Sequence, residues 1–176
     1  MIRRPPRSTL SSSSAASDVY KRQGGYGTFS VAEDVVLLAQ AYPLLLPWDE
    51  ERESWTLEPI LSWGDQVVAE VADYSVTVKH PPTWQVVATG EERISGSGIT
   101  EVHGRNLREF AFVLIKNYTG ASRMADGVEI RSWYPQELRG AGGKALELCV
   151  EALSIYRELF GEYPFPELDV LSLIHI

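Results

Sequence analysis

The sequence is poor in the residues that most often build metal and redox sites. It contains one cysteine, Cys149, and three histidines, His80, His103 and His175. A lone cysteine excludes an internal disulfide and a cysteine-rich metal site. No two histidines are four residues apart, so the zinc-binding pattern HExxH is absent from the sequence.

The sequence also lacks a long apolar run and a surplus of basic residues. No stretch approaches the roughly 18 to 20 apolar residues of a membrane-spanning helix, so we expect no membrane segment. The formal net charge is -8. Nucleic acid is therefore a poor candidate partner, because phosphate binding needs a basic surface. The cellular compartment stays open.

Two hexapeptides, DVYKRQ at 18–23 and LSLIHI at 171–176, are related to each other. A DNA segment that encodes the first can encode the second when its complementary strand is read. We interpret both as translated transposase-end sequence of the kind used in sequencing libraries, with MIRRPPRST and SSAAS as further adapter. Residues 1–23 are thus expected to be adapter-derived and disordered, and residues 171–176 to be adapter-derived and to prolong the strand expected in ELDV.

A targeting segment is the competing interpretation of the N-terminal residues. Arg3, Arg4 and Arg7 resemble the basic start of a signal or transit peptide. A proline pair and the polar run Ser11 to Ser14 follow, however, where a secretory signal has an apolar stretch. The remaining residues, 24–170, have about the length of one domain.

Between Val67 and Trp133 the sequence has the pattern of a series of short strands. In YSVTVK apolar and polar residues alternate, which is the two-residue period of a half-buried strand. WQVVAT and GVEIRSWY are interpreted as further strands, and Phe110 to Ile115 is apolar throughout, so it is predicted to be buried on both faces. With a turn at SGSG and other Gly and Pro breaks, the pattern predicts a mainly β fold, as a sandwich or an open, curved sheet.

A helix is predicted after these strands. From Lys144 to Phe160 apolar residues recur every three or four positions, and Gly161 stands where a left-handed C-terminal cap is expected. The preceding GAGG, at 140–143, is interpreted as a hinge-like stretch. EYPFPELDV is interpreted as a proline-stiffened turn that leads into a short strand.

The change from strands to a helix suggests a domain boundary between about Pro135 and Gly143. We therefore predict an N-terminal β domain at 24–139 and the start of a second domain at 140–170. In the run VAEDVVLLAQAYPLLLPWDEE, the prolines argue against one continuous helix, so strand and loop are predicted there.

Several segments, in order, resemble a known family. The chain is similar to the N-terminal half of the aminopeptidase-N-like zinc metallopeptidases, the gluzincins, in ADYSVTVKHPPTWQVVATGE, NLREFAFVLIKNY and ALSIYRELFGEYPFPELDV. AYPLLLPWDE, Trp55 and WGDQV resemble the bacterial branch of that family. The likeness covers nearly all of residues 26–170, and YRELFGEYPFPELD is its most specific part. It implies a saddle-like or sandwich β domain followed by the first helix and strand of an α+β catalytic domain.

The resemblance implies zinc chemistry in a longer parent protein. Members of the family hydrolyse peptides with a zinc ion held by the two histidines of HExxH and a distant Glu, while the Glu of the motif acts as general base. In relatives the motif lies beyond the position of Val170. We therefore expect an inactive fragment without a cofactor of its own, in which no residue is assigned a catalytic, cofactor-binding or metal-ligating role. Peptide substrate and zinc are expected for the parent only, with the remainder of its catalytic domain as the missing partner.

Three further polar features have a competing functional interpretation. A metal site assembled from His80 and His103 across strands is conceivable, but polar strand and loop histidines are far commoner. The acidic run Asp49, Glu50, Glu51 and Glu53 is interpreted as a solvated loop rather than as a calcium or amine site. SGSG lacks the lysine and helix of a phosphate loop and is interpreted as a hairpin connection.

Cys149 and three tyrosines are also interpreted structurally. Cys149 lies on the apolar stripe of the predicted helix, so a buried thiol is favoured over a nucleophile. Tyr134, Tyr156 and Tyr163 are expected to pack through their rings rather than to face a cleft.

The function predicted from the sequence is that of a fragment of a zinc aminopeptidase-like metallopeptidase, whose β domain walls one side of the substrate cleft. Two alternatives stay open. The same architecture serves as a non-catalytic interaction scaffold in a transcription-factor subunit, and a free-standing β-sandwich binding module with a helical tail is also compatible. Because part of its surroundings would be missing, the helix is expected to expose apolar surface.

Overall fold

The computed structural model describes residues 29–43, 48–55 and 71–172. The elements in chain order are β1 (Phe29–Ala32), β2 (Val35–Ala39), β3 (Trp48–Asp49), β4 (Ser54–Trp55), β5 (Ala72–Lys79), β6 (Gln85–Ala88), β7 (Glu91–Gly96), β8 (Ile99–Leu107), β9 (Ala111–Ile115), β10 (Tyr118–Ala125), β11 (Val128–Pro135), a 3-10 turn η1 (Gln136–Leu138), α2 (Arg139–Phe160) and β12 (Glu167–Leu171). The predicted mainly β fold is confirmed, and the described residues before Val67 form strands and turns as expected.

Some predictions fall outside the described residues. These are the adapter-derived interpretation of residues 1–23, the segment WGDQV and the end of the chain from residue 173 onward, which includes His175. The expected prolongation of the last strand is confirmed for the residues that are described. Leu171 belongs to β12, and the Ser172 N–H donates to the Trp133 carbonyl at 2.9 Å.

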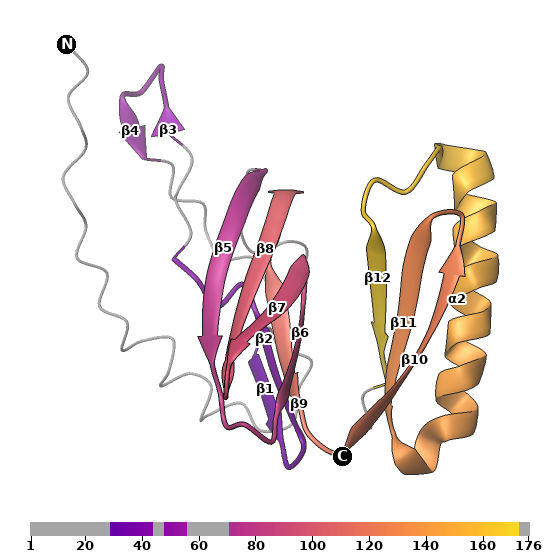
Figure 1. Cartoon of the computed structure of the whole chain (residues 1–176). Helices are drawn as coiled ribbons and strands as arrows, with labels where there is room; N and C mark the ends of the chain where they lie inside the picture. The colour runs from indigo at the N-terminus through magenta and orange to yellow at the C-terminus, as the bar shows by residue number, and fades with distance from the viewer. Residues whose placement is uncertain (1–28, 44–47, 56–70, 173–176) are drawn as a thin grey trace.

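Two antiparallel sheets pack against each other and form what we call the two-sheet region, residues 29–43 and 71–115. Their strand orders are β1-β2-β9-β6 and β5-β8-β7. Buried Val78 and Val102 from one sheet share a core with Val86 from the other and with Phe110. This packing of two sheets on one core agrees with a sandwich (Figure 1).

The strand β9 is buried on both faces, as its uninterrupted apolar sequence predicts. It pairs with β2 on one side and β6 on the other. Phe112 and Leu114 pack on the core between the two sheets, whereas Val113 and Ile115 belong to a second cluster on the opposite face. The turn after Gly96 connects β7 to β8, so SGSG is a hairpin connection as predicted.

The remainder of the described chain forms what we call the helix-covered sheet, residues 118–172. Its strand order is β10-β11-β12, in which β10 pairs antiparallel with β11 and β12 pairs parallel with β11. α2 packs on one face, where Val128, Ile130 and Leu153 form a buried cluster. Figure 1 shows α2 on the side of this sheet that is turned away from the two-sheet region.

The structure corrects the predicted hinge at 140–143. These residues belong to α2, which begins at Arg139 rather than at Lys144. Gly142 is buried, and a Cβ atom there would lie 1.9 Å from Cδ1 of Tyr134. The Ser132 hydroxyl donates to the Gly142 carbonyl at 3.0 Å. Glycine at this position therefore lets the helix backbone approach the sheet closely, which the sequence pattern of a flexible hinge does not reveal.

The predicted C-terminal cap is found at Gly161. Its N–H donates to the Arg157 carbonyl at 3.0 Å, and its φ of 96° is positive as expected. Its ψ of -172°, however, places it in an extended conformation that essentially only glycine adopts, rather than in the left-handed helical region. The chain consequently leaves the helix abruptly and enters the proline-rich turn.

The structure joins strands from both sides of the predicted domain boundary. β11 precedes this boundary and β12 follows it, yet Ile130 lies opposite Leu168 in one ladder. The division at 24–139 and 140–170 stays a prediction. Within the described ranges, no helix is both long enough and apolar enough to span a bilayer.

Candidate functional site

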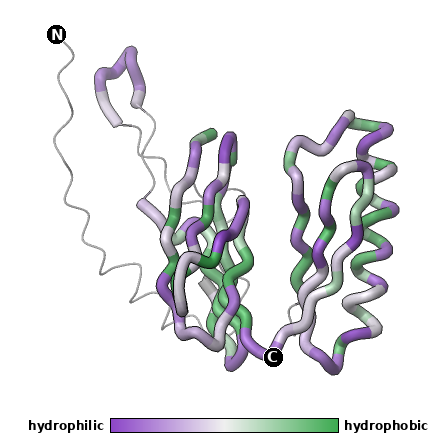
Figure 2. The backbone as a smooth tube through the Cα atoms, in the orientation of Figure 1, coloured by the Kyte–Doolittle hydropathy of each residue, from purple (hydrophilic) through white to green (hydrophobic). Residues whose placement is uncertain are grey.

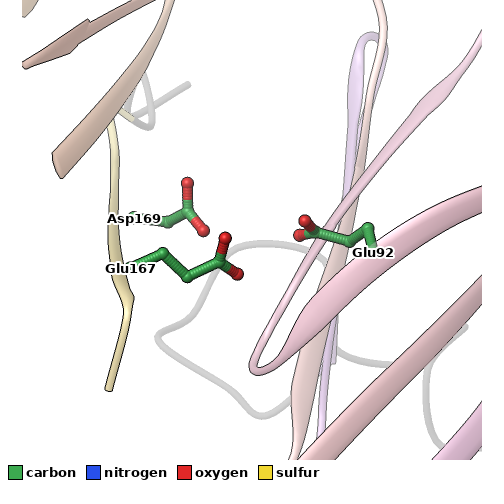
Figure 3. A group of neighbouring side chains, drawn as sticks. All are labelled: Glu92, Glu167 and Asp169. Carbon is green, nitrogen blue, oxygen red and sulfur yellow. The ribbon is translucent and has the colours of Figure 1, made fainter. Parts of the chain in front are cut away.

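Four charged side chains meet where the two regions contact each other. Arg131 lies on β11, Glu167 and Asp169 lie on β12, and Glu92 comes from β7 of the two-sheet region. Because side chains alternate along a strand, Arg131 points away from the sheet face on which α2 packs. Figure 3 shows Glu92 pointing across the junction toward the two carboxylates of β12.

Arg131 is the centre of this charged cluster. Its Nη2 atom lies 3.1 Å from Glu92 Oε2 and 3.2 Å from Glu167 Oε1, and its Nε donates to Asp169 Oδ1 at 2.8 Å. The side chains are largely removed from solvent, with exposed fractions between 12% for Asp169 and 19% for Arg131. A single guanidinium therefore ties the two regions together.

Neighbouring groups hold two of the carboxylates in place. The Trp133 indole N–H donates to Asp169 Oδ1 at 2.7 Å, and its ring centroid lies 5.9 Å from the guanidinium carbon of Arg131. The Ala88 N–H donates to Glu92 Oε1 at 2.7 Å. Hydrogen bonds of this kind hold a carboxylate in one position.

The cluster has more negative than positive groups, which shifts its protonation equilibria. Burial, and then the charges of Glu92 and Asp169, raise the pKa of Glu167 to about 7, although Arg131 opposes the rise. Burial also raises the pKa of Glu92. Burial alone would lower the pKa of Arg131, but the hydrogen bonds that Arg131 donates to Asp169 and the charges of the surrounding carboxylates outweigh it, so that this pKa is raised. Arg131 thus stays charged, while Glu167 is the carboxyl group that titrates near neutral pH.

Glu167 Oε1 is the one buried side-chain oxygen of the described residues that makes no hydrogen bond. Arg131 Nη2 is near enough for an ion pair but lacks the alignment of a hydrogen bond to this atom. Binding a proton stabilises a buried carboxylate that has such an oxygen, in agreement with the raised pKa of Glu167. The arrangement is therefore suited to taking up and releasing one proton near neutrality.

The charged cluster does not fit a zinc ion. Oxygen atoms of Glu92, Glu167 and Asp169 lie within 4.8 Å of one another, which is a separation that a metal ion can bridge. Arg131, however, already lies at ion-pair distance from all three, so a metal cation would meet its positive charge. The set also lacks the histidine or cysteine ligands that zinc sites commonly contain.

The charged cluster borders two clefts between the regions. One has a volume of about 570 Å³ and is lined by Trp84, Glu92 and Arg131 among others. The other has a volume of about 1020 Å³ and lies between β8 and the proline-rich turn, with Glu167 and Asp169 in its wall. Both clefts therefore offer apolar and aromatic walls beside the same charged groups.

The structure does not bring His80 and His103 together. His103 lies opposite Ser75 in the β5–β8 ladder, so His80 is five residues farther along, roughly 16 Å at about 3.3 Å per residue. His80 Nε2 lies 3.0 Å from the Thr100 hydroxyl and its Nδ1 lies 3.0 Å from the Pro81 carbonyl. These contacts are those of a structural histidine rather than of a metal ligand.

The acidic run is a solvated turn between β3 and β4, as predicted. Asp49 Oδ1 accepts the Glu51 N–H at 3.0 Å and the Arg52 N–H at 2.9 Å. The side chains of Glu50, Glu51 and Glu53 are exposed. Asp49 therefore stabilises the turn through its own backbone neighbours.

Cys149 and the three tyrosines have different surroundings. Cys149 packs half-buried on the cluster beneath α2, which agrees with a structural thiol. Tyr134 is buried, whereas Tyr156 is exposed and has its ring centroid 6.0 Å from that of Phe160. Tyr163 packs edge to face on Phe165 and also lines the larger cleft. Tyr163 thus both packs through its ring and faces a cleft.

The charged cluster was not identified from the sequence. Glu167 and Asp169 are two residues apart on a predicted strand, which places them on one face and is a usable signal. Arg131 lies on the predicted strand GVEIRSWY, in which apolar and polar residues also alternate. Glu92, however, is 39 residues from Arg131, and only the packing of the two regions brings them together.

Comparison with models of protein families and with curated proteins finds no match to this chain.

Proposed function

We propose that this chain is the β-rich part, with the first helix and strand of the catalytic domain, of a zinc-dependent aminopeptidase-like metallopeptidase. The observation that carries the proposal is that three segments resemble the family in the same order along the chain. They correspond to β5 to β6, to β9 with its flanks, and to the end of α2 with β12. The most specific segment, YRELFGEYPFPELD, forms the helix end, the proline-rich turn and most of β12. In the parent protein, the two-sheet region would wall one side of the peptide cleft.

The larger of the two clefts supports this position. It is lined by the turn Tyr163–Pro166 and by β8, so the most specific family-like segment faces the two-sheet region across an open space. Ligand sites commonly lie between two structural units in this way. The zinc chemistry is assigned to the remainder of the parent, because the described residues do not fit zinc and the sequence has no HExxH.

The test is the reading frame of the source DNA, followed by assay of the longer protein. A frame that continues into HExxH and a downstream Glu is the expected result. The purified longer protein should then bind zinc and release N-terminal residues from a peptide, with loss of both on chelation. A continuous frame without these residues, or a native stop soon after Val170, would contradict the proposal.

A non-catalytic interaction module is a second candidate, favoured by the exposed apolar side chains of α2. Leu148, Ile155 and Leu159 are each more than half exposed. A continuous frame in which the HExxH positions are replaced supports a scaffold, and a native stop soon after Val170 supports a small binding module. Pull-down of a specific partner by either protein would then be the positive test.

A further inference from the structure

α2 carries apolar residues on two opposite sides. Its inner side, with Leu146, Val150 and Leu153, packs on the helix-covered sheet. Ile155 and Leu148 lie roughly 200° and 220° around the helix axis from Leu153, measured in the same direction at about 100° per residue. They are therefore on the side turned away from the sheet. Figure 2 shows hydrophobic segments recurring along the whole helix.

The apolar residues of this outer side form a continuous line, which we call the outer stripe. Its members are Leu148, Ala152, Ile155 and Leu159, with spacings of four, three and four residues. Leu148 is 52% exposed, Ile155 56% and Leu159 67%. This spacing is the one by which a helix packs along a second helix, and helices that are apolar on both sides are normally covered on both.

One edge of the outer stripe is negatively charged. Glu151 and Glu158 are seven residues apart, which places them on the same edge, and both are exposed. Among the described residues neither has an ion-pair partner, whereas Glu147 pairs with Lys144. The charge along this edge is therefore available to an incoming group.

We propose that the outer stripe docks an amphipathic α-helix that has apolar residues at three- and four-residue spacing and Lys or Arg along the edge that meets Glu151 and Glu158. The partner's apolar residues would cover the stripe, and its cations would pair with the two carboxylates. This docking site lies on the opposite side of the helix from the sheet and the clefts. If the parent is a peptidase as proposed above, this helix would belong to the remainder of its catalytic domain.

The same charges disfavour two other occupants. In an antiparallel pair of two copies joined through the outer stripe, Glu151 of one copy would lie beside Glu158 of the other, and like charges repel. An anionic membrane surface would likewise place lipid phosphates against these carboxylates. A basic helix, by contrast, would form attractive contacts with both Glu151 and Glu158.

The test compares two designed helical peptides with the same leucine seam, one with Lys and one with Glu on the flanking positions. Binding to the full chain is measured by fluorescence anisotropy. We expect the Lys peptide to bind about fivefold more tightly, as two exposed ion pairs allow. The double variant Glu151→Lys and Glu158→Lys should reverse the preference. Ile155→Asp should weaken both peptides while the circular dichroism spectrum stays unchanged.

A matched control carries the same change of charge elsewhere. The double variant Glu50→Lys and Glu51→Lys alters the exposed β3–β4 turn and should keep the preference for the Lys peptide. Four results would overturn the proposal: no binding of the Lys peptide, equal binding of both peptides, binding insensitive to Ile155→Asp, or a preference equally lost in the control. Self-association or binding to anionic vesicles that Ile155→Asp abolishes would instead assign the stripe to a second copy or to lipid.

Discussion

The two-sheet region and the helix-covered sheet differ in how completely they bury their apolar residues. In the two-sheet region, β9 has neighbouring strands on both sides and packed clusters on both faces. In the helix-covered sheet, α2 packs one side on β10 and β11 and leaves Leu148, Ile155 and Leu159 exposed on the other. Both faces of β9 are thus covered, although Ile94 at the edge of the first region is 81% exposed, whereas the second region has an apolar surface along α2 that is suited to a further layer.

The contact between the regions combines apolar and charged groups. Val87 and Ile115 of the two-sheet region pack with Trp133 and Leu171 of the helix-covered sheet. Beside them, Arg131 links carboxylates from both regions. Apolar packing supplies most of the attraction in such a contact, while a buried ion network fixes one geometry at the cost of desolvation.

A substitution of Arg131 is expected to weaken the contact between the two regions the most. Arg131→Met leaves Glu92, Glu167 and Asp169 buried without their common cation. We expect the free energy of unfolding to fall by about 3 to 5 kcal/mol, as for other broken buried pairs. Urea denaturation followed by tryptophan fluorescence measures the change.

Two further variants sharpen this prediction. Arg93→Met changes an exposed arginine of β7 and should alter the free energy of unfolding by less than about 0.5 kcal/mol. Adding Glu167→Gln to Arg131→Met should recover part of the loss, because one uncompensated charge disappears. If Arg131→Met and Arg93→Met both lowered the free energy of unfolding by about 3 to 5 kcal/mol, or if neither lowered it, the network would not join the regions.

The contact between α2 and its sheet is tested at Gly142. Gly142→Ala places a methyl group within 1.9 Å of the Tyr134 ring, so we expect a loss of about 1 to 3 kcal/mol in the free energy of unfolding. Gly143→Ala is the matched control, since a Cβ there meets nothing within 4 Å. It should raise stability by up to about 1 kcal/mol through helix propensity. Thermal unfolding by circular dichroism distinguishes the two, and equal effects would contradict the close approach.

The protonation of Glu167 gives the contact a pH dependence. Because its pKa is raised from the ordinary 4.5 to about 7, the folded protein holds this proton more tightly than the unfolded chain. The free energy of unfolding contributed by this group should therefore fall as the pH rises from about 4.5 through 7, by on the order of 1 kcal/mol. Glu92 acts in the same direction, since its pKa is also raised.

Glu167→Gln removes this titration and should flatten the corresponding part of the pH profile. Glu101→Gln, on β8, serves as a control whose profile should follow that of the unmodified protein. Chemical denaturation at about pH 5 and pH 8 is sufficient for the comparison. An increase of stability over this interval that Glu167→Gln abolishes would reverse the assigned sign.

The smallest effect on stability is expected at the outer stripe. Ile155 is 56% exposed, so Ile155→Ser should change the free energy of unfolding by less than about 0.5 kcal/mol. It should nevertheless lower the fluorescence of a dye that binds apolar surface, because the stripe is interrupted at its centre. Unchanged dye fluorescence together with a large loss of stability would mean that Ile155 is covered.

The elements that could be predicted from the sequence are those whose periodicity is local. Alternation in YSVTVK, the uninterrupted apolar run at Phe110 to Ile115 and the helical recurrence from Lys144 onward each correspond to an observed element. GAGG was misinterpreted because a glycine needed for close packing looks the same as a glycine needed for flexibility. Only Tyr134, which meets Gly142 from β11, distinguishes the two.

The charged cluster was hidden for a different reason. Arg131 and Glu92 are ordinary charged residues on alternating strands, and such residues usually face solvent. Their burial depends on the packing of one region on the other, which no local pattern encodes. By contrast, the acidic turn at Asp49 could be predicted because it is one continuous run of charges in the sequence, and its hydrogen bonds are with its own backbone neighbours.

Arg131 makes the carboxylates of the junction an ion-pair network rather than a metal site. Zinc content of the purified chain after equilibrium dialysis against zinc at neutral pH tests it most directly. We expect far less than one zinc per chain. One tightly held zinc per chain, lost in Glu167→Gln, would contradict it.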